Sequence, residues 1–271
     1  MCVNCDWTRR SFLRLALGAT GAAALAPRPA FATAAEIPPA QRPLVMLDPG
    51  HGGHDPGAIA PDGIFEKHIT LATGFVLRRA LLATRRYRVA MTRTRDVFVP
   101  LQDRVNDAVN QNANLFISLH CDHLPIDNLR GASVFTLSNT ASDALSADLA
   151  HDENSADTTA PAITGVSPKV ADILASLEAR ATNLNSASLA QDIARSFRGV
   201  VPLLPDPERS ANFAVLRDAS TPSTLVEMGC LTNKLDEKRL RDPKQRALIA
   251  GLLVQAIDAY FAHYAQQRMA G

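Results

Sequence analysis

The feature that most constrains the fold is a short apolar run that stops abruptly at a turn-forming sequence. Residues 44–47, Leu-Val-Met-Leu, are followed at 48–53 by Asp-Pro-Gly-His-Gly-Gly. The run predicts a buried strand, and the turn follows because Pro fixes φ and Gly permits positive φ. His51 is therefore expected where a strand meets a loop. In open α/β sheets that edge collects ligands, although a loop histidine that bonds a backbone carbonyl would give the same pattern.

Two further apolar runs deliver an ionisable side chain in the same way. One leads into His120 and the other into Glu227. Glu66 opens a segment whose apolar residues recur at helical spacing, which places it in a first helical turn near the end of the first strand. Two histidines and a glutamate are a usual ligand set for catalytic zinc, which keeps a fourth position for water. The residues thus indicate one zinc ion held by His51, Glu66 and His120.

Strands and helices alternate along much of the chain. Hydrophobic spacing predicts strands at 44–48, 88–93, 115–120, 132–137, near 213–216 and at 223–228, and helices at 66–84, 100–112, 186–199 and 243–266. This alternation predicts a single α/β domain with a twisted, mostly parallel or mixed sheet of about six strands and helices on both faces. Arg104, between the apolar residues of one predicted helix, is expected to face water or a carboxylate.

The N-terminus has the features of an export signal. Paired arginines at 9–10 precede an uncharged stretch at 15–26, which is shorter than the roughly 20 residues that a membrane span needs. Small residues fit a cleavage site after Ala32, which we favour, or after Ala34. We expect a twin-arginine signal at 1–32 and a periplasmic mature protein without a membrane span. The alternative is a basic disordered tail.

Charge and cysteine content narrow the remaining possibilities. Lys and Arg number 28 against 27 Asp and Glu, and the basic excess lies in the N-terminal segment. The balance gives no electrostatic case for nucleic-acid binding. Cys2 and Cys5 would leave with the signal, so Cys121 and Cys230 remain in the mature chain. They could pair in an oxidising compartment, but we favour two buried thiols.

The ordered motifs together resemble a known family, the zinc-dependent N-acetylmuramoyl-L-alanine amidases that separate daughter cells. The motifs are Leu-Asp-Pro-Gly-His-Gly-Gly at 47–53, Glu66, Ser-Leu-His-Cys-Asp at 118–122 and Val-Glu-Met-Gly-Cys-Leu-Thr-Asn at 226–233. The resemblance implies a lead-in at 33–42 and a catalytic domain at 43–268. Cys121 stands where the family usually has Ala, and Cys230 where it usually has Phe, so we expect a difference in local packing rather than in the chemistry.

The resemblance also implies a reaction. It is hydrolysis of the amide between N-acetylmuramic acid and the L-alanine of the peptidoglycan stem peptide, in cell-wall remodelling and daughter-cell separation. Zinc would polarise the carbonyl and bring its water near pKa ~7, and Glu227 is the expected general base. Asp122 follows His120 by two residues on an extended stretch, so it is either a weak ligand or holds the water. The alternatives are another zinc amide hydrolase or carboxypeptidase acting on cell-wall peptides, and a non-catalytic wall-binding domain.

Residues 139–185 interrupt the alternation with two helical patterns, at 142–157 and 168–180. The family has an inhibitory helix at this place, so the resemblance implies a regulatory insertion in which Glu153 occupies the open zinc position. It further implies release by a degenerate LytM-type protein activator. The second pattern presents an apolar stripe for docking, formed by Val170, Ile173, Leu174 and Leu177. The alternative is a surface excursion packed on the sheet.

Overall fold

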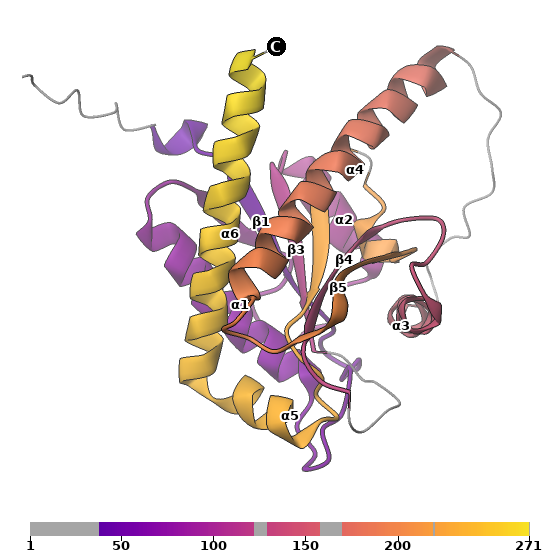
Figure 1. Cartoon of the computed structure of the whole chain (residues 1–271), viewed down its shortest axis with the longest axis vertical. Helices are drawn as coiled ribbons and strands as arrows, with labels where there is room; N and C mark the ends of the chain where they lie inside the picture. The colour runs from indigo at the N-terminus through magenta and orange to yellow at the C-terminus, as the bar shows by residue number, and fades with distance from the viewer. Residues whose placement is uncertain (1–37, 122–128, 158–169, 219, 271) are drawn as a thin grey trace, which may run out of the picture. The chain divides into compact units, whose positions relative to one another are not determined.

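The computed structural model describes residues 38–121, 129–157, 170–218 and 220–270 (Figure 1). The strands are β1 (Leu44–Pro49), β2 (Arg88–Met91), β3 (Leu115–His120), β4 (Ala132–Leu137), β5 (Leu203–Ala211) and β6 (Ser223–Glu227). The α-helices are α1 (Glu66–Ala83), α2 (Leu101–Asn110), α3 (Ala144–Ser155), α4 (Val170–Phe197), α5 (Lys234–Arg241) and α6 (Pro243–Ala270). Two short 3₁₀ helices are η1 (Pro39–Gln41) and η2 (Ala214–Leu216).

The six strands form one mixed sheet in the order β2-β1-β3-β6-β4-β5. All pairs are parallel except β4 with β6, which is antiparallel. The carboxyl ends of β1, β3 and β6 therefore meet at one edge of the sheet, and His120 and Glu227 are partners in register there. The predicted α/β class with a mixed sheet of about six strands is confirmed.

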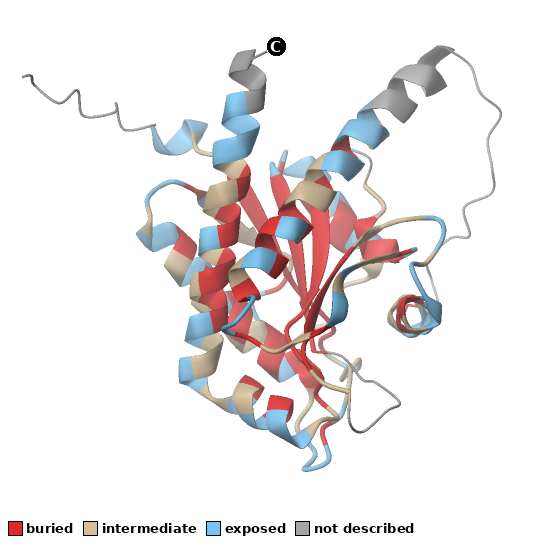
Figure 2. Ribbon diagram, viewed as in Figure 1, coloured by how far each residue is buried: buried red, intermediate tan, exposed pale blue. Residues whose placement is uncertain are grey.

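Successive residues of β1 face opposite sides of the sheet, and each side has its own apolar core. The central strands are coloured as buried in Figure 2. Val45 and Leu47 pack with α1, α4 and α6, whereas Met46 packs with α2 and α3. Both cores are largely sealed from water, and fully burying one such side chain contributes about 1.5–3 kcal/mol. Covering both faces explains why the central strands carry apolar residues at successive positions, as at 44–47 and 115–117.

Helix α6 is long and apolar enough to cross a membrane by composition alone, over Pro243–Gln266. In this fold it packs against α1 and α4. In Figure 1, α4 crosses in front of the sheet and α6 runs along its left side. Leu253 and Ile257 on α6 are fully buried in the core. Core packing therefore accounts for the hydrophobicity of this helix.

Strand β5 departs from the sequence prediction. The expected strand near 213–216 is wrong, because residues 214–216 form η2, and the edge strand is instead β5. Pro205 and Pro207 obscure β5 in the sequence because Pro cannot donate to a strand ladder. The pairing with β4 skips from Leu203 to Glu208, so these prolines lie in a bulge where no ladder bond is lost.

The helices of the insertion differ in one respect from those expected. Helix α3 matches the first pattern, but the patterns at 168–180 and 186–199 belong to one continuous helix, α4. Helix α5 was not predicted. The signal segment, Asp122 and the side chains of the stripe at Val170, Ile173, Leu174 and Leu177 lie outside the described residues. Cys121 and Cys230 are buried thiols outside any disulfide, as favoured.

Candidate metal centre

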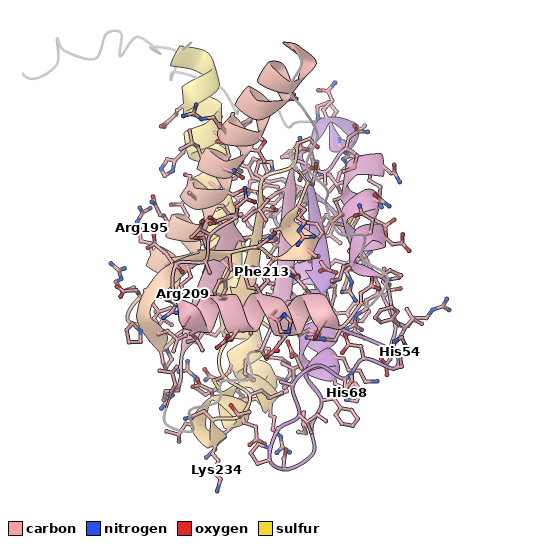
Figure 3. The ribbon with its side chains drawn as sticks, turned by 90° about the vertical axis from the view of Figure 1, so that its right-hand side faces the viewer. His54, His68, Arg195, Arg209, Phe213 and Lys234 are labelled. Atoms are coloured by element: carbon pink, nitrogen blue, oxygen red, sulfur yellow. The ribbon has the colours of Figure 1, made fainter. Side chains whose placement is uncertain are left out.

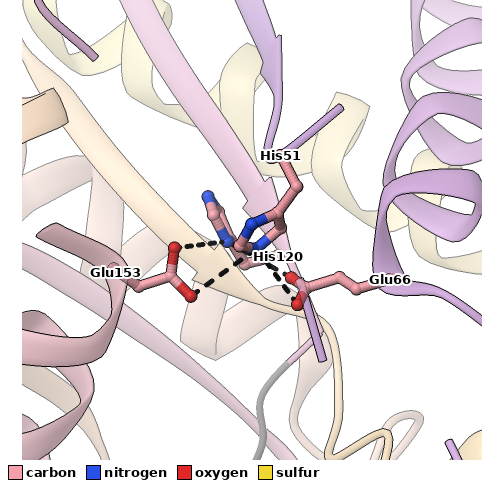
Figure 4. A group of neighbouring side chains, drawn as sticks. All are labelled: His51, Glu66, His120 and Glu153. Carbon is pink, nitrogen blue, oxygen red and sulfur yellow. Dashed lines mark ion pairs between the residues drawn. The ribbon is translucent and has the colours of Figure 1, made fainter. Parts of the chain in front are cut away.

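Four side chains from four elements meet at the carboxyl edge of the sheet (Figure 4). His51 lies in the turn after β1, Glu66 is the first residue of α1, His120 is the last residue of β3 and Glu153 lies near the end of α3. One ligand atom from each lies within 4.8 Å of the others. The structure thus brings together the three predicted zinc ligands and the predicted inhibitory glutamate.

Both carboxylates lie between the two imidazoles. Glu66 places Oε2 3.1 Å from His51 Nε2 and Oε1 3.2 Å from His120 Nδ1. Glu153 approaches the same nitrogens, with Oε1 3.6 Å from His51 Nε2 and Oε2 3.2 Å from His120 Nδ1. His51 and His120 therefore face the centre with different ring nitrogens.

Glycine is required in two places because side chains of the centre crowd the backbone. A Cβ on Gly50 would lie 2.3 Å from the ring of His120. A Cβ on Gly57, where φ is 65°, would lie 2.5 Å from the ring of His51 and 2.6 Å from Glu66 Oε2. His51 itself has φ of 59°, a conformation that costs a non-glycine residue about 1–3 kcal/mol. The turn that the sequence indicated is shaped to present His51.

Each of the three predicted ligands also contacts a further polar group on its other side. His51 Nδ1 lies 2.9 Å from Asp55 Oδ2, and His120 Nε2 lies 3.1 Å from Ser118 Oγ. Glu66 accepts the backbone N–H of Ala58 at 2.8 Å and that of Cys121 at 2.7 Å. Such contacts orient metal ligands and fix which nitrogen of a histidine faces the metal.

The centre has a strongly negative local environment. Burial opposes protonation of His51 and His120, but the carboxylates of Glu66 and Glu153 outweigh it and raise the pKa of each imidazole to about 10. Burial alone would raise the pKa of Glu66, yet the two imidazoles hold it well below its usual range. A site that favours positive charge to this extent is suited to a cation, which would release the imidazole protons on binding.

The donor set fits a metal ion. His51 Nε2 and His120 Nδ1 are buried nitrogens that make no hydrogen bond within the part of the chain described here. Both point toward the carboxylates of Glu66 and Glu153. Imidazole and carboxylate ligands in this number are typical of zinc sites.

Glu227 is completely buried at the end of β6, outside the four-residue cluster. Because it is in register with His120 on a parallel neighbour, the two side chains leave the same face of the sheet about 4.8 Å apart. The predicted base therefore lies beside a predicted ligand. Asp122, the further candidate close to His120 in sequence, lies outside the described residues.

Sequence reasoning missed two buried polar residues behind His120 and left a third open. Asp48 and Ser118 are fully buried, and Arg104 is 2% exposed. Arg104 faces a carboxylate, as one of the two expected alternatives had it, through an ion pair of 2.8 Å with Asp48. The period-2 spacing of Ser118 and His120 was the available signal, since it puts both side chains on one face.

Helix α3 crosses the face of the sheet that carries the centre, near Phe213 (Figure 3). Asn154 fixes its end by donating to the carbonyl of Asn212 at 2.8 Å and accepting the N–H of Ala214 at 2.7 Å. Asp157 accepts the N–H of Leu101 at 3.0 Å. A pocket of about 480 Å³ lies between this helix and the loop after β1, and it is lined by His51, Asp55, Gly57, Ala58, Ile59, Glu66, Leu149, Asp152, Glu153, Ser155 and Ala156.

Comparison with known proteins finds one matching family and several similar chains. The family described as N-acetylmuramoyl-L-alanine amidase matches residues 45–259. The chain is 38% identical over 227 residues to N-acetylmuramoyl-L-alanine amidase AmiA of Salmonella typhimurium, covering 83% of this chain and 78% of the relative. It is 35% identical to AmiC of Neisseria meningitidis serogroup B, over 81% of this chain and 53% of the relative.

A solved structure shows the same fold. The CwlD amidase from Clostridioides difficile, in complex with the GerS lipoprotein, superposes with a TM-score of 0.61 at 23% identity. The match covers 82% of this chain and 99% of that chain.

Proposed function

Because this chain belongs to the N-acetylmuramoyl-L-alanine amidase family, we propose that it is a zinc-dependent hydrolase of peptidoglycan. Its substrate bond is the amide between N-acetylmuramic acid and the L-alanine of the stem peptide. The reaction serves cell-wall remodelling and daughter-cell separation in the periplasm. The observation that carries this proposal is the convergence of His51, Glu66 and His120 at one edge of the sheet, with two orphaned imidazole nitrogens facing a shared carboxylate.

One zinc ion per chain would be held by His51 Nε2, His120 Nδ1 and Glu66. When bound, zinc supplies a polarised carbonyl and a water whose pKa is near ~7. The chain holds the three ligands rigidly, because Asp55, Ser118 and two backbone N–H groups fix their orientation. Asp122 is a further candidate, as a weak ligand or as the residue that holds the water.

Glu227 is the proposed general base. An amide is hard to cleave because its nitrogen is a poor leaving group until it is protonated. Glu227 accepts one proton from the attacking water and delivers it to that nitrogen, so the amine leaves neutral. Its buried place beside His120 suits a group that takes up and returns a proton at the centre.

Glu153 is proposed to keep the resting enzyme inactive. Its carboxylate lies where a substrate carbonyl would approach, 3.2 Å from His120 Nδ1, and the anchors of Asn154 hold α3 in that place. Release then needs a partner that binds the displaced form better. The proposed partner is a degenerate LytM-type activator that docks on Val170, Ile173, Leu174 and Leu177.

The proposal extends to cellular location. A twin-arginine signal at 1–32 would carry the folded protein to the periplasm, where peptidoglycan lies. A carboxypeptidase would use a similar ligand set and stays a second candidate on the residues alone. A non-catalytic wall-binding domain is disfavoured because Glu227 is retained beside a complete ligand set.

The test joins metal content to activity. Purified mature protein should carry one zinc per chain by elemental analysis, and it should release dye from labelled peptidoglycan once its inhibition is relieved. Chelation should abolish dye release, and added zinc should restore it. A protein that cleaves equally well after complete removal of metal would refute the proposal.

A further inference from the structure

A chain of buried polar groups lies directly behind His120. Ser118 and His120 are two residues apart on β3, so their side chains leave the same face of the sheet. Ser118 Oγ lies 3.1 Å from His120 Nε2 and donates to Asp48 Oδ2 at 2.8 Å. Exposed fractions of 0% for Ser118 and Asp48 and 4% for His120 remove water as a competing partner.

The direction of these hydrogen bonds follows from counting protons. Asp48 Oδ1 already receives the hydroxyl of Thr92 at 2.6 Å and the guanidinium of Arg104 at 2.8 Å. A carboxylate surrounded by donors accepts at both oxygens. Ser118 therefore donates its single hydroxyl proton to Asp48 Oδ2. The oxygen of Ser118 can then only accept from His120. The proton of a neutral His120 is therefore on Nε2.

That placement decides which nitrogen of His120 can bind a metal. With the proton on Nε2, Nδ1 carries a lone pair, and Nδ1 is the nitrogen that faces Glu66 and Glu153 at 3.2 Å. His51 has the opposite arrangement, because Asp55 accepts from its Nδ1 and leaves Nε2 toward the centre. The two histidines thus need two different supporting groups, one a carboxylate and the other a hydroxyl backed by a carboxylate.

We propose that Asp48 and Ser118 are positioning residues of the metal centre, which hold the proton of His120 on Nε2 and so keep Nδ1 available as a ligand. This inference rests on the proposed function, since it assumes that the centre binds zinc. Arg104 connects Asp48 to the backbone of the other histidine, His51. Its guanidinium, paired with Asp48, also donates to the carbonyl of His51 at 2.9 Å and to that of Pro49 at 3.1 Å. One buried ion pair therefore supports both the His120 side chain and the turn that presents His51.

Ser118 variants test the proposal through zinc affinity, measured by competition with a chromophoric chelator. Ser118→Ala should bind zinc roughly 10–100-fold more weakly, the usual effect of losing such a supporting contact. Ser118→Thr keeps the hydroxyl and should recover most of the affinity. The matched control is Thr224→Val, which also removes a fully buried hydroxyl. Thr224 lies on β6 in register with Ile117, so its side chain faces the core on the other side of the sheet from His120. It should bind zinc as the wild type does.

Asp48→Asn gives a second, sharper test. Because Oδ1 faces two donors, the new amide NH₂ must face Ser118, whose hydroxyl then turns to donate to His120 Nε2. The proton of His120 would move to Nδ1, so this variant should lose more zinc affinity than Ser118→Ala. Nitrogen-15 NMR of the zinc-loaded wild type should show His120 protonated at Nε2.

The outcomes distinguish failure of the positioning role from failure of the proposed zinc-dependent function. A wild type that takes up no zinc overturns both. A wild type that binds zinc, with Ser118→Ala equal to it in affinity or with His120 bound through Nε2, overturns the positioning role alone. Ser118→Ala and Ser118→Thr decide the question even where Asp48→Asn fails to fold with Arg104 left unpaired.

Discussion

Removing the carboxylate of Glu153 is expected to raise the activity of the protein in the absence of any partner. Glu153 is 16% exposed in its side chain and reaches both imidazoles of the centre with its two oxygens. Glu153→Ala deletes these contacts but leaves the buried apolar residues of α3, Leu149 and Ala150, in place. Helix α3 should therefore stay folded, while its position over the centre becomes less stable.

The size of the effect follows from the contacts that are lost. If the blocked and open forms stand at roughly 99:1, they differ by about 2.7 kcal/mol. Glu153 forms close ion pairs with both imidazoles, and we take their loss as worth about 1.5–3 kcal/mol, the range for an interaction with a charged group. The open fraction then rises from about 1% to between about 11% and 60%. Basal hydrolysis should rise roughly 10–60-fold.

The assay is dye release from labelled peptidoglycan by the zinc-loaded protein without activator. Asp148→Ala is the matched control, because it removes one exposed carboxylate from the same helix away from the centre, and it should leave the basal rate unchanged. Asn154→Ala tests the hydrogen bonds that fix the end of α3, and it leaves the carboxylate of Glu153 in place. It deletes two hydrogen bonds to the segment at Asn212 and Ala214, worth about 2 kcal/mol together, and should raise the basal rate roughly 20-fold.

An unchanged basal rate in Glu153→Ala, with zinc still bound, would refute the inhibitory role. The insertion would then return to the plainer reading of a surface excursion packed on the sheet. If the basal rate rises in Glu153→Ala but not in Asn154→Ala, Glu153 is still inhibitory, but Asn154 does not hold α3 in its inhibitory position.

Four further outcomes are expected. Glu66→Ala should lose zinc and activity together, since it removes one of the three proposed ligands, and elemental analysis beside dye release will show whether it does. Glu227→Gln should keep zinc and lose about 10²–10⁴-fold in rate, whereas loss of zinc would make it a ligand. Although burial alone would raise the pKa of Asp48, Arg104, Thr92 and Ser118 hold it below its ordinary value of about 4. The stability that Asp48 contributes should therefore be present above that value and fall as pH drops through the folded pKa, a slope that urea titrations should not find in Asp48→Asn. Replacing the arginines at 9–10 by lysine should block export, and periplasmic recovery of that double variant would exclude the twin-arginine route.

Local signals explain why much of the fold could be predicted. The strands ending at His120 and Glu227 are short apolar runs bounded by polar residues, and both were predicted to within a residue. Strand β5 could not be predicted, because its pairing tolerates Pro205 and Pro207 only through a bulge that depends on β4. Propensity likewise could not show that 168–180 and 186–199 join into α4, since packing against α6 and the sheet determines the length of that helix.

The candidate site divides in the same way. His51, Glu66 and His120 follow from residue type and position in the sequence, because parallel strands deliver their ends to one edge. Glu153 came from the order of motifs in a resembling family, as no local pattern links α3 to the centre. The hydrogen bond from Ser118 to Asp48 joins residues that are 70 positions apart in the sequence. It could be inferred only once the register of β1 and β3 was known.

Product analysis on purified sacculi tests the central claim most directly. The zinc-loaded protein carrying Glu153→Ala should release intact stem peptides with a free amino group on L-alanine, and it should leave glycan strands with unsubstituted N-acetylmuramic acid. Mass spectrometry distinguishes these products from all others. Release of fragments cut within the stem peptide, with L-alanine still joined to the glycan, would contradict the amidase assignment.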